Sequence, residues 1–164
     1  MIKKLEAGSF IPDFELLDQN GETFRLSEHL GGKNLVIYFY PKDETQGCTQ
    51  EACSFRDSYE DFKDSDAEVI GISNDGVKSH RSFADHHRLP FTLLSDPRGR
   101  VRKLFGVPRS LLGLVPGRTT YIADKNGKIV YIFNSQIEPR KHVEIALDIL
   151  KKINSNIIVK AYEI

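Results

Sequence analysis

Short apolar runs separated by polar turns divide this chain into strands and helices. Five runs have the length and the bounding turn residues of buried strands. They are Asn34–Tyr40, Glu68–Ser73, Phe91–Leu94, Thr119–Ala123 and Lys128–Phe133. Between the first two runs, apolar residues recur at steps of three and four, which indicates a helix; they are Ala52, Phe55, Tyr59 and Phe62. A strand, helix, strand order predicts that the two strands are parallel.

Turn residues and further patterns complete the elements. Asn126-Gly127, between the two late strands, predicts an antiparallel hairpin, because both residues tolerate positive φ. Asn20-Gly21 predicts a second hairpin, which joins Phe14–Leu17 to Thr23–Leu26. Three more segments have helical patterns, and they are Ser79–Arg88, Gly99–Phe105 and Pro139–Ile153.

These elements predict an α/β domain with one mixed sheet flanked by helices. A parallel beginning, a terminal antiparallel hairpin and a closing helix match the layout of a thioredoxin-like fold, an analogy that carries no function by itself. The length of 164 residues suits one domain. We therefore expect a single domain over residues 1–154. Residues 155–164 form an extension that is an added edge strand, an interface arm or a frayed terminus.

The composition excludes several classes of partner. The chain is 40% hydrophobic, and 23 Lys and Arg residues balance 23 Asp and Glu residues. This balance lacks the basic excess that nucleic acid or anionic lipid attracts. The apolar runs are too short to span a bilayer, and Met1–Glu6 lacks the apolar stretch of a signal peptide. We expect a soluble, cytoplasmic protein, or an organellar one if a transit peptide has been removed.

Cys48 has the position of a reactive thiol. It follows a strand and the polar loop Pro41–Gly47, and it opens the predicted helix. Free amide groups and the positive end of the helix dipole stabilise a thiolate there. The alternative is that both cysteines are small core hydrophobes, but a turn among Lys, Asp, Glu, Thr and Gln is a poor place to bury an inert thiol.

The second cysteine, Cys53, follows five residues later. In an α-helix this spacing separates the two Cα atoms by roughly 9 Å and about 140° around the axis. A disulfide tolerates no more than about 7 Å between Cα atoms. If the two thiols react with each other, the first turns of the helix must unwind.

The residues around Cys48 resemble the peroxiredoxins. The pattern Pro41-x-x-x-Thr45-x-x-Cys48 matches the active-site signature of that family, and the stretch from Tyr38 to Arg56 is similar to its peroxiredoxin Q, or bacterioferritin comigratory protein, branch. The resemblance covers roughly Ala7 to Leu150. It continues through four more stretches, which are Glu68–Ser73, Leu89–Asp96, Lys103–Val107 and Pro116–Tyr121.

The resemblance implies a role for each residue of the motif. Cys48 would be the peroxidatic thiolate, which attacks a peroxide oxygen and becomes a sulfenic acid. Cys53 would be the resolving thiol, which forms an intramolecular disulfide with Cys48. Arg118 would stabilise the thiolate and the developing negative charge.

The remaining motif residues would shape the peroxide site. Thr45 would hold the sulfur or the peroxide with its hydroxyl, and Pro41 would shield the sulfur from water. Gly47 would complete the substrate-binding set together with Cys48 and Arg118. Glu51, on the same helical turn, would orient Arg118.

The family further implies a peroxidase for hydrogen peroxide and organic hydroperoxides, in antioxidant defence. A thioredoxin-type dithiol protein would recycle it, and no bound cofactor is needed. We expect a monomer, with a homodimer as the alternative. Two other functions remain open: a thiol-disulfide oxidoreductase, although the usual Cys-x-x-Cys is missing, and a non-enzymatic redox sensor or holdase.

Two further signals are weaker. The five histidines lack the spacing of metal ligands, so we expect no metal and a solvated position for each; they are His29, His80, His86, His87 and His142. The apolar connection Val107–Val115 covers the core, or, if exposed, lines a hydroperoxide pocket or docks a reductant.

Overall fold

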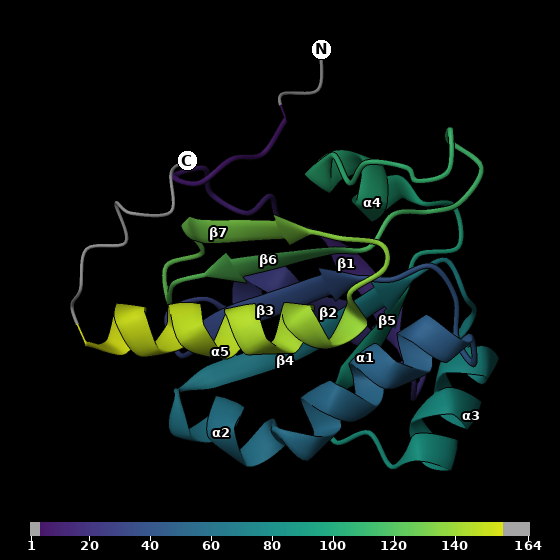
Figure 1. The fold of residues 1–164 in the computed structure, drawn as a ribbon, viewed down its shortest axis with the longest axis horizontal. Helices are drawn as coiled ribbons and strands as arrows, with labels where there is room; N and C mark the ends of the chain where they lie inside the picture. The colour runs from purple at the N-terminus through teal and green to yellow at the C-terminus, as the bar shows by residue number, and fades with distance from the viewer. Residues whose placement is uncertain (1–3, 156–164) are drawn as a thin grey trace.

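The computed structural model describes residues 4–155, in which a single sheet of seven strands separates two layers (Figure 1). The strands are β1 (Glu15–Asp18), β2 (Thr23–Arg25), β3 (Asn34–Phe39), β4 (Ala67–Ser73), β5 (Thr92–Ser95), β6 (Thr119–Ala123) and β7 (Ile129–Asn134). The helices are α1 (Gln46–Asp57), α2 (Tyr59–Asp64), α3 (Val77–His87), α4 (Arg100–Phe105) and α5 (Pro139–Asn154), with a short 3-10 helix at Leu26–His29.

The sheet is mixed, with the strand order β2-β1-β5-β4-β3-β6-β7. The central strands β3, β4 and β5 are parallel to one another. The outer pairings, β2 with β1, β1 with β5, β3 with β6 and β6 with β7, are antiparallel. The predicted α/β class and thioredoxin-like layout are therefore confirmed. Of the predicted extension at residues 155–164, Ser155 caps α5 and residues 156–164 lie outside the described residues, so its role stays a prediction.

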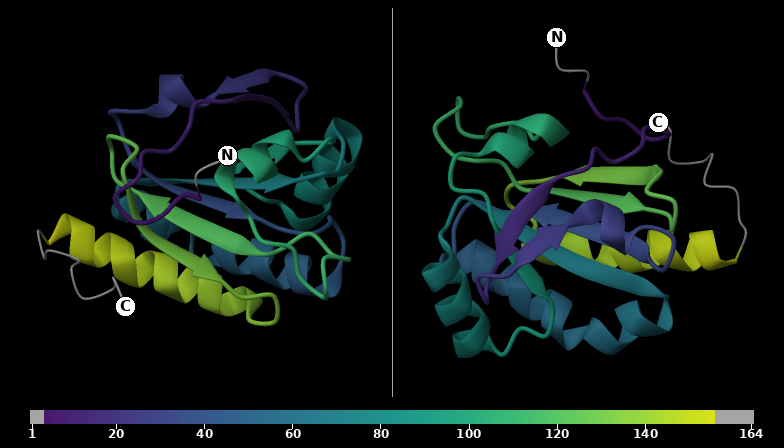
Figure 2. Two further views of the ribbon diagram at one scale, coloured as in Figure 1. Left: turned by 90° about the horizontal axis from the view of Figure 1, so that it is seen from above. Right: turned by 180° about the vertical axis from the view of Figure 1, so that it is seen from behind.

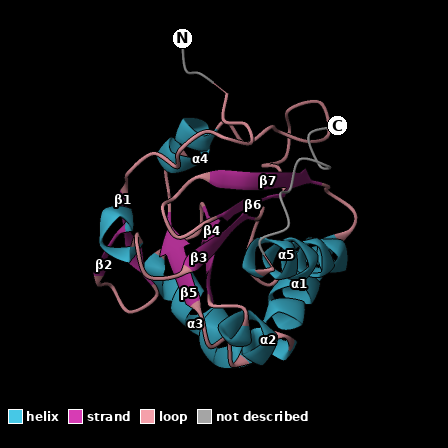
Figure 3. Ribbon diagram, turned by 90° about the vertical axis from the view of Figure 1, so that its left-hand side faces the viewer, coloured by secondary structure: helices cyan, strands magenta, loops and turns pink. Residues whose placement is uncertain are grey.

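Two hydrophobic cores lie on opposite faces of the sheet because side chains alternate along each strand. In β3, Val36 and Tyr38 enter the core formed with α1, α2, α3 and α5. Leu35, Ile37 and Phe39 enter the second core, with the N-terminal segment and α4. Figure 3 shows the four helices on one side of the sheet and α4 on the other, and Figure 2 shows the purple N-terminal segment across the back of the sheet.

The predicted helix between β3 and β4 is interrupted. Ser58 ends α1 and begins α2, with a backbone (φ −100°, ψ 10°) outside the helical range. Serine favours such a position because its hydroxyl competes for backbone hydrogen bonds. Phe55 and Phe62 stay on one buried face, with ring centroids 5.5 Å apart. The helical spacing of the apolar residues therefore continues across the break, so this spacing alone does not show that the helix is interrupted.

Both predicted hairpins are confirmed, although their turns use only the glycine. Gly21 and Gly127 have positive φ (78° and 81°), whereas the preceding asparagines do not. At the second turn the Asp124 carboxylate accepts hydrogen bonds from the backbone N–H groups of Asn126 and Lys128. A register shift at Ile122 and Ala123 accommodates this turn.

Strand direction brings distant segments to one edge of the sheet. The β3 strand ends at Phe39, which pairs with Thr119, the first residue of the antiparallel β6. Thr119 also pairs with Asn134, the last residue of β7. The loop after β3, the residue before β6 and the segment after β7 therefore meet at this edge, beside the beginnings of α1 and α5.

Gly71 in β4 tests the packing of the sheet against its helices. A Cβ at this position would lie 2.8 Å from Tyr38 Cζ and 2.9 Å from Leu93 Cδ2. Since both neighbours are fully buried, we expect Gly71→Ala to lower the free energy of unfolding by about 1–3 kcal/mol. Urea unfolding measures this change. The control is Gly32→Ala, where nothing lies within 4 Å of the added Cβ; an equal effect of the two changes would contradict the packing described.

Candidate active site

Cys48 occupies the first turn of α1, and its side chain is only 1% exposed. The amide of Thr49 donates to the carbonyl of Thr45, at the cap of the helix. The backbone N–H groups that precede Thr49 in the helix have no intrahelical carbonyl to donate to, and they form the positive end of the helix dipole. An anion at this position is therefore electrostatically favoured.

Arg118 contacts the sulfur directly. Its Nη2 donates to Cys48 Sγ at 3.3 Å, its Nη1 donates to Glu51 Oε1 at 2.7 Å and its Nε donates to the carbonyl of Gln136 at 3.3 Å. The side chain is 4% exposed. Because all three nitrogens are engaged, the guanidinium has one orientation, with a charged N–H group directed at the sulfur.

The sequence explains how the helix presents both partners of this arginine. Cys48 and Glu51 are three residues apart, so they lie on one face of α1. Gly47 leaves space for the guanidinium, since a Cβ there would lie 3.0 Å from Arg118 Nη2. The predicted contact of Glu51 with Arg118 is thus present in the structure.

Burial and charge act on these groups in opposite directions. Glu51 is fully buried, and this burial raises its pKa to about 8, although the charge and hydrogen bond of Arg118 oppose the rise. Burial lowers the pKa of Arg118, but Glu51 and Cys48 outweigh it, so that pKa stays above its ordinary value. The arginine is a cation at all relevant pH values.

His142 lies behind Glu51 and is fully buried, so the predicted solvated position is wrong for this residue. It is the fourth residue of α5, and this helix packs against α1. Its Nδ1 lies 2.7 Å from Thr120 Oγ1 and 3.6 Å from Glu51 Oε2, and its Nε2 lies 2.8 Å from the Ser135 carbonyl. Burial, aided by the charge of Arg118, lowers the pKa of His142 to about 4.

His80 is also buried, again in contrast to the prediction, and it anchors the loop before α1. Its Nδ1 lies 2.7 Å from Asp43 Oδ2, and its Nε2 lies 2.9 Å from the Leu94 carbonyl. Tyr40 and Ser79 donate their hydroxyl hydrogens to the same Asp43 carboxylate. The loop residue Asp43 thus joins its neighbour Tyr40 to Ser79 and His80, which lie more than 30 residues further along the chain, so no local motif reveals this network.

Arg102 is a second buried guanidinium that the sequence analysis did not identify. Its Nη1 donates to the Gly117 carbonyl and its Nη2 to the Tyr40 carbonyl, each at 2.8 Å. Burial lowers its pKa to about 10. Arg102 thus joins the residue before Pro41 to the residue before Arg118, the two segments that meet at the sulfur.

Thr45 and Pro41 lie in the segment that joins β3 to α1. The Thr45 side chain is exposed, and its hydroxyl donates to the carbonyl of Lys42 at 2.8 Å. Pro41 is half-buried and lies two residues after the end of β3. The peroxide-binding roles of Thr45, Pro41 and Gly47 stay predictions.

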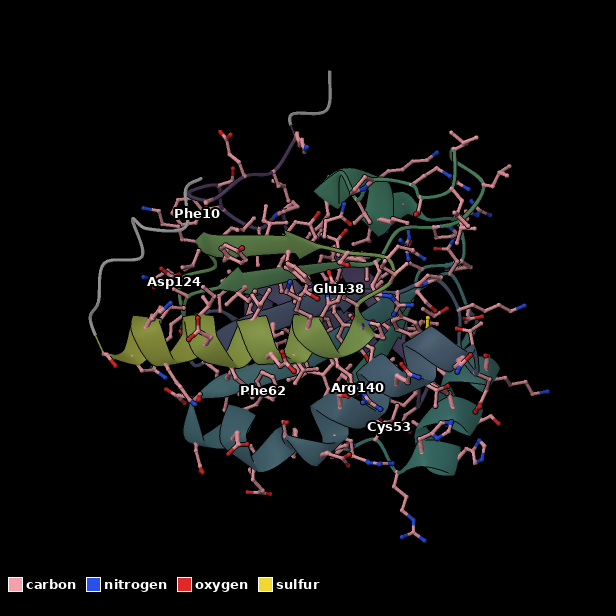
Figure 4. All side chains as sticks on the ribbon, viewed as in Figure 1. Phe10, Cys53, Phe62, Asp124, Glu138 and Arg140 are labelled. Atoms are coloured by element: carbon pink, nitrogen blue, oxygen red, sulfur yellow. The ribbon has the colours of Figure 1, made fainter. Side chains whose placement is uncertain are left out.

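Cys53 projects from α1, five residues beyond Cys48, and is half-buried (Figure 4). Both thiols are free. Because both belong to one regular helix, their Cα atoms are about 9 Å apart by helix geometry, beyond the limit of about 7 Å for a disulfide. The described structure is the reduced form, in which the thiols cannot bond.

The apolar connection Val107–Val115 and the histidine pair His86–His87 both lie at the surface. Leu111, Leu112 and Leu114 are exposed (66%, 103% and 80%), so the Val107–Val115 connection does not cover the core throughout. His86 and His87 lie 3.0 and 3.1 Å from the Glu44 carboxylate at the surface. Among residues 4–155, no helix is long and apolar enough to cross a membrane.

Comparison with known proteins defines the class to which this fold and site belong. The family model described as the AhpC/TSA family matches residues 7–132. The chain therefore belongs to the AhpC/TSA family.

The relatives support that placement within the family. Chloroplastic peroxiredoxin Q of Triticum aestivum is 53% identical over 150 residues, which is 92% of this chain and 69% of the relative. The corresponding Arabidopsis thaliana protein is 53% identical over 148 residues, 90% of this chain and 68% of the relative. The chain is therefore placed in the peroxiredoxin Q branch of the family, and it is a thiol-dependent peroxidase.

Solved structures agree with this assignment. The peroxidoxin BcpB of Mycobacterium tuberculosis has a TM-score of 0.84 at 40% identity and covers 91% of this chain and 98% of its own. The bacterioferritin comigratory protein of Xanthomonas campestris, studied for alkyl peroxide reduction, has a TM-score of 0.81 at 30% identity and covers 90% and 99%.

The contact between Arg118 and Cys48 generates a direct prediction. We expect Arg118→Ala to slow the reaction of Cys48 with hydrogen peroxide by roughly 100-fold, since a charged donor to the reacting sulfur is lost. Single-turnover peroxide consumption at pH 7 measures the rate. The control is Arg98→Ala, which removes an exposed arginine and leaves the rate unchanged. Equal rates for the two variants would show that Arg118 has no role at the sulfur.

Proposed function

We propose that this chain completes a peroxidase cycle with two cysteines of its own. The observation that carries this proposal is the buried Arg118 guanidinium, which donates one N–H group to Cys48 Sγ and another to Glu51. A fixed cation beside a sulfur at a helix N-terminus favours both the thiolate and the negative charge that develops on the peroxide.

In the first step, the Cys48 thiolate attacks the terminal peroxide oxygen. A sulfur–oxygen bond forms while the oxygen–oxygen bond breaks, so the sulfur is oxidised and the peroxide is reduced. Cys48 becomes a sulfenic acid, and the leaving alkoxide or hydroxide takes a proton to become an alcohol or water. Pro41, Thr45 and Gly47 border the peroxide at this step, and Arg118 stabilises the charge on its oxygens.

In the second step, Cys53 resolves the sulfenic acid. Its sulfur attacks Cys48 Sγ, a disulfide forms, and the sulfenic oxygen leaves as water with the thiol proton. The half-buried position of Cys53 on α1 supports this role, but helix geometry forbids the bond while α1 is intact. The first turns of α1 therefore unwind between the two steps.

In the third step, a thioredoxin-type dithiol protein reduces the disulfide and is itself oxidised. Unwinding of α1 exposes the two sulfurs to such a partner. The substrates are hydrogen peroxide and organic hydroperoxides; the related Xanthomonas campestris protein was studied for alkyl peroxide reduction. We expect a monomer, because the proposed chemistry needs no second copy, and a homodimer stays the alternative.

The compartment stays a prediction. Curated relatives from Triticum aestivum and Arabidopsis thaliana are named chloroplastic, whereas the structural relatives come from bacteria. The plant relatives support the organellar alternative, and the cytoplasmic location stays an expectation from the sequence. In either place, a dithiol reductant is the partner that the proposed cycle requires.

The two cysteines have separable roles. We expect Cys48→Ser to abolish peroxide turnover, because a hydroxyl is neither ionised nor strongly nucleophilic at neutral pH. Cys53→Ser should keep the first oxidation and lose the intramolecular disulfide, so that Cys48 accumulates as sulfenic and sulfinic acid. Peroxide consumption with a thioredoxin system and peptide mass spectrometry measure both effects. Turnover by Cys48→Ser would remove the proposed function.

The spacing of the cysteines predicts a conformational change. Amide hydrogen exchange should become faster across residues 47–56 when the disulfide forms, while β4 (Ala67–Ser73) changes little, because its backbone bonds do not depend on α1. The control is Cys53→Ser treated with the same peroxide, in which α1 stays protected. Equal protection of α1 in the reduced and the disulfide-containing chain would contradict coupled unwinding.

A further inference from the structure

Behind the arginine lies a buried carboxylate oxygen without a partner. Glu51 is fully buried, and its Oε1 accepts the hydrogen bond of Arg118. Its Oε2 is also buried and has no hydrogen-bond partner. The polar atom that faces it is Nδ1 of His142, 3.6 Å away. An unpaired charged oxygen in such a place is costly, so the protonation of this pair needs an explanation.

The hydrogen bonds of His142 identify its tautomer. Nε2 lies 2.8 Å from the Ser135 carbonyl, which only accepts, so Nε2 carries a hydrogen. Burial lowers the pKa of His142 to about 4, so the ring is neutral at pH 7 and Nδ1 presents a lone pair. The Thr120 hydroxyl donates to that lone pair at 2.7 Å. Two acceptors, Nδ1 and Glu51 Oε2, then face each other unless a proton lies on one of them.

The charges around the pair favour a proton there. Arg118, the residue before β6, is the cation in contact, and it faces two potential anions, Cys48 and Glu51, both from α1. Tyr38 from β3 is buried and interacts with both, and burial raises its pKa, so it stays neutral. Glu138, just before α5, acts on His142 electrostatically. If Cys48 and Glu51 were both ionised, the single cation would be divided between them.

We propose that Glu51 carries a proton on Oε2, the oxygen that faces Nδ1 of the neutral His142 ring, and that His142 is thereby a positioning residue, which keeps the charge of Arg118 directed at the Cys48 sulfur. This inference rests on the proposed function of Cys48 and deepens it. The carboxyl form of Glu51 still accepts from Arg118 through Oε1, so the guanidinium keeps its orientation without being neutralised.

The proposal predicts a pH dependence with a definite sign. Burial raises the pKa of Glu51 to about 8, so the proton is present below that pH and is lost above it. Above it, Glu51 is a full anion that competes with the thiolate for Arg118. The rate of the first oxidation should therefore fall on the alkaline side, with a midpoint near pH 8.

The experiment measures the single-turnover rate of Cys48 with hydrogen peroxide from pH 5 to 10 in the full chain. Glu51→Gln keeps a carbonyl for Arg118 but cannot ionise, so the alkaline fall should disappear. His142→Gln places an amide donor near Oε2, which stabilises the carboxylate, so the fall should move to lower pH by about one unit. The control is His29→Gln, which removes a similar histidine–glutamate pair, 3.0 Å from Glu68, away from the site; its profile should match the unchanged chain.

A second measurement needs neither a variant nor peroxide. In the reduced chain with ¹⁵N-labelled histidine, the His142 shifts should show a hydrogen on Nε2 and an acceptor at Nδ1, and both should change near the pH of the alkaline fall. A hydrogen on Nδ1, constant shifts through pH 7–9, or an unchanged profile in His142→Gln would overturn the proposal. These shifts do not depend on turnover, so they separate failure of this inference from failure of the peroxidase function, which the Cys48→Ser comparison tests.

Discussion

The hydrogen bond from the Arg118 guanidinium to Cys48 Sγ is the interaction on which the rest of the site depends. It joins a cation to a sulfur that is almost completely buried. Such a cation needs a fixed orientation and compensation for lost solvent, which Glu51 and the Gln136 carbonyl supply. The fold makes this contact possible because β6 runs antiparallel to β3, so Arg118 lies where β3 ends.

Much of the fold follows from local pattern, and so does the reactive thiol. The five apolar runs and two Asn-Gly turns predicted the seven strands, because alternation and turn chemistry are properties of short segments. Cys48 was identifiable from its place at the start of a helix. The break at Ser58 was not, since Phe55 and Phe62 keep the helical period across it. Local pattern therefore defines elements better than it defines their interruptions.

The supporting groups of the site could not be predicted in the same way. Arg118 was assigned through the family resemblance alone, because its approach to Cys48 depends on the register of β6 with β3. His80 and His142 were placed at the surface, since histidine in a polar helix gives no sign of burial. The partner of His80 is Asp43, in the loop before α1. The partners of His142 are Thr120 from β6 and Glu51 from α1. Arg102 was missed for the same reason, because its partners are backbone carbonyls of two distant segments.

The geometry of α1 creates a conflict that the catalytic cycle must resolve. The intact helix presents Cys48 to Arg118, yet the same helix keeps Cys53 out of bonding range. The cycle therefore requires both an ordered reduced form and a rearranged oxidised form. The helix stability that suits the peroxide step opposes the resolution step. A long-lived helix favours attack on the peroxide, whereas an easily unwound helix favours resolution before further oxidation.

A single chain carries the whole oxidative half of the proposed cycle in Cys48 and Cys53. The most direct measurement is to add one equivalent of hydrogen peroxide to the fully reduced chain without reductant, quench it, and determine the intact mass and the peptide map. We expect complete consumption of the peroxide and a monomeric product lighter by two hydrogen atoms, with a bond between Cys48 and Cys53. Unconsumed peroxide with two free thiols, or disulfides between separate chains, would contradict it.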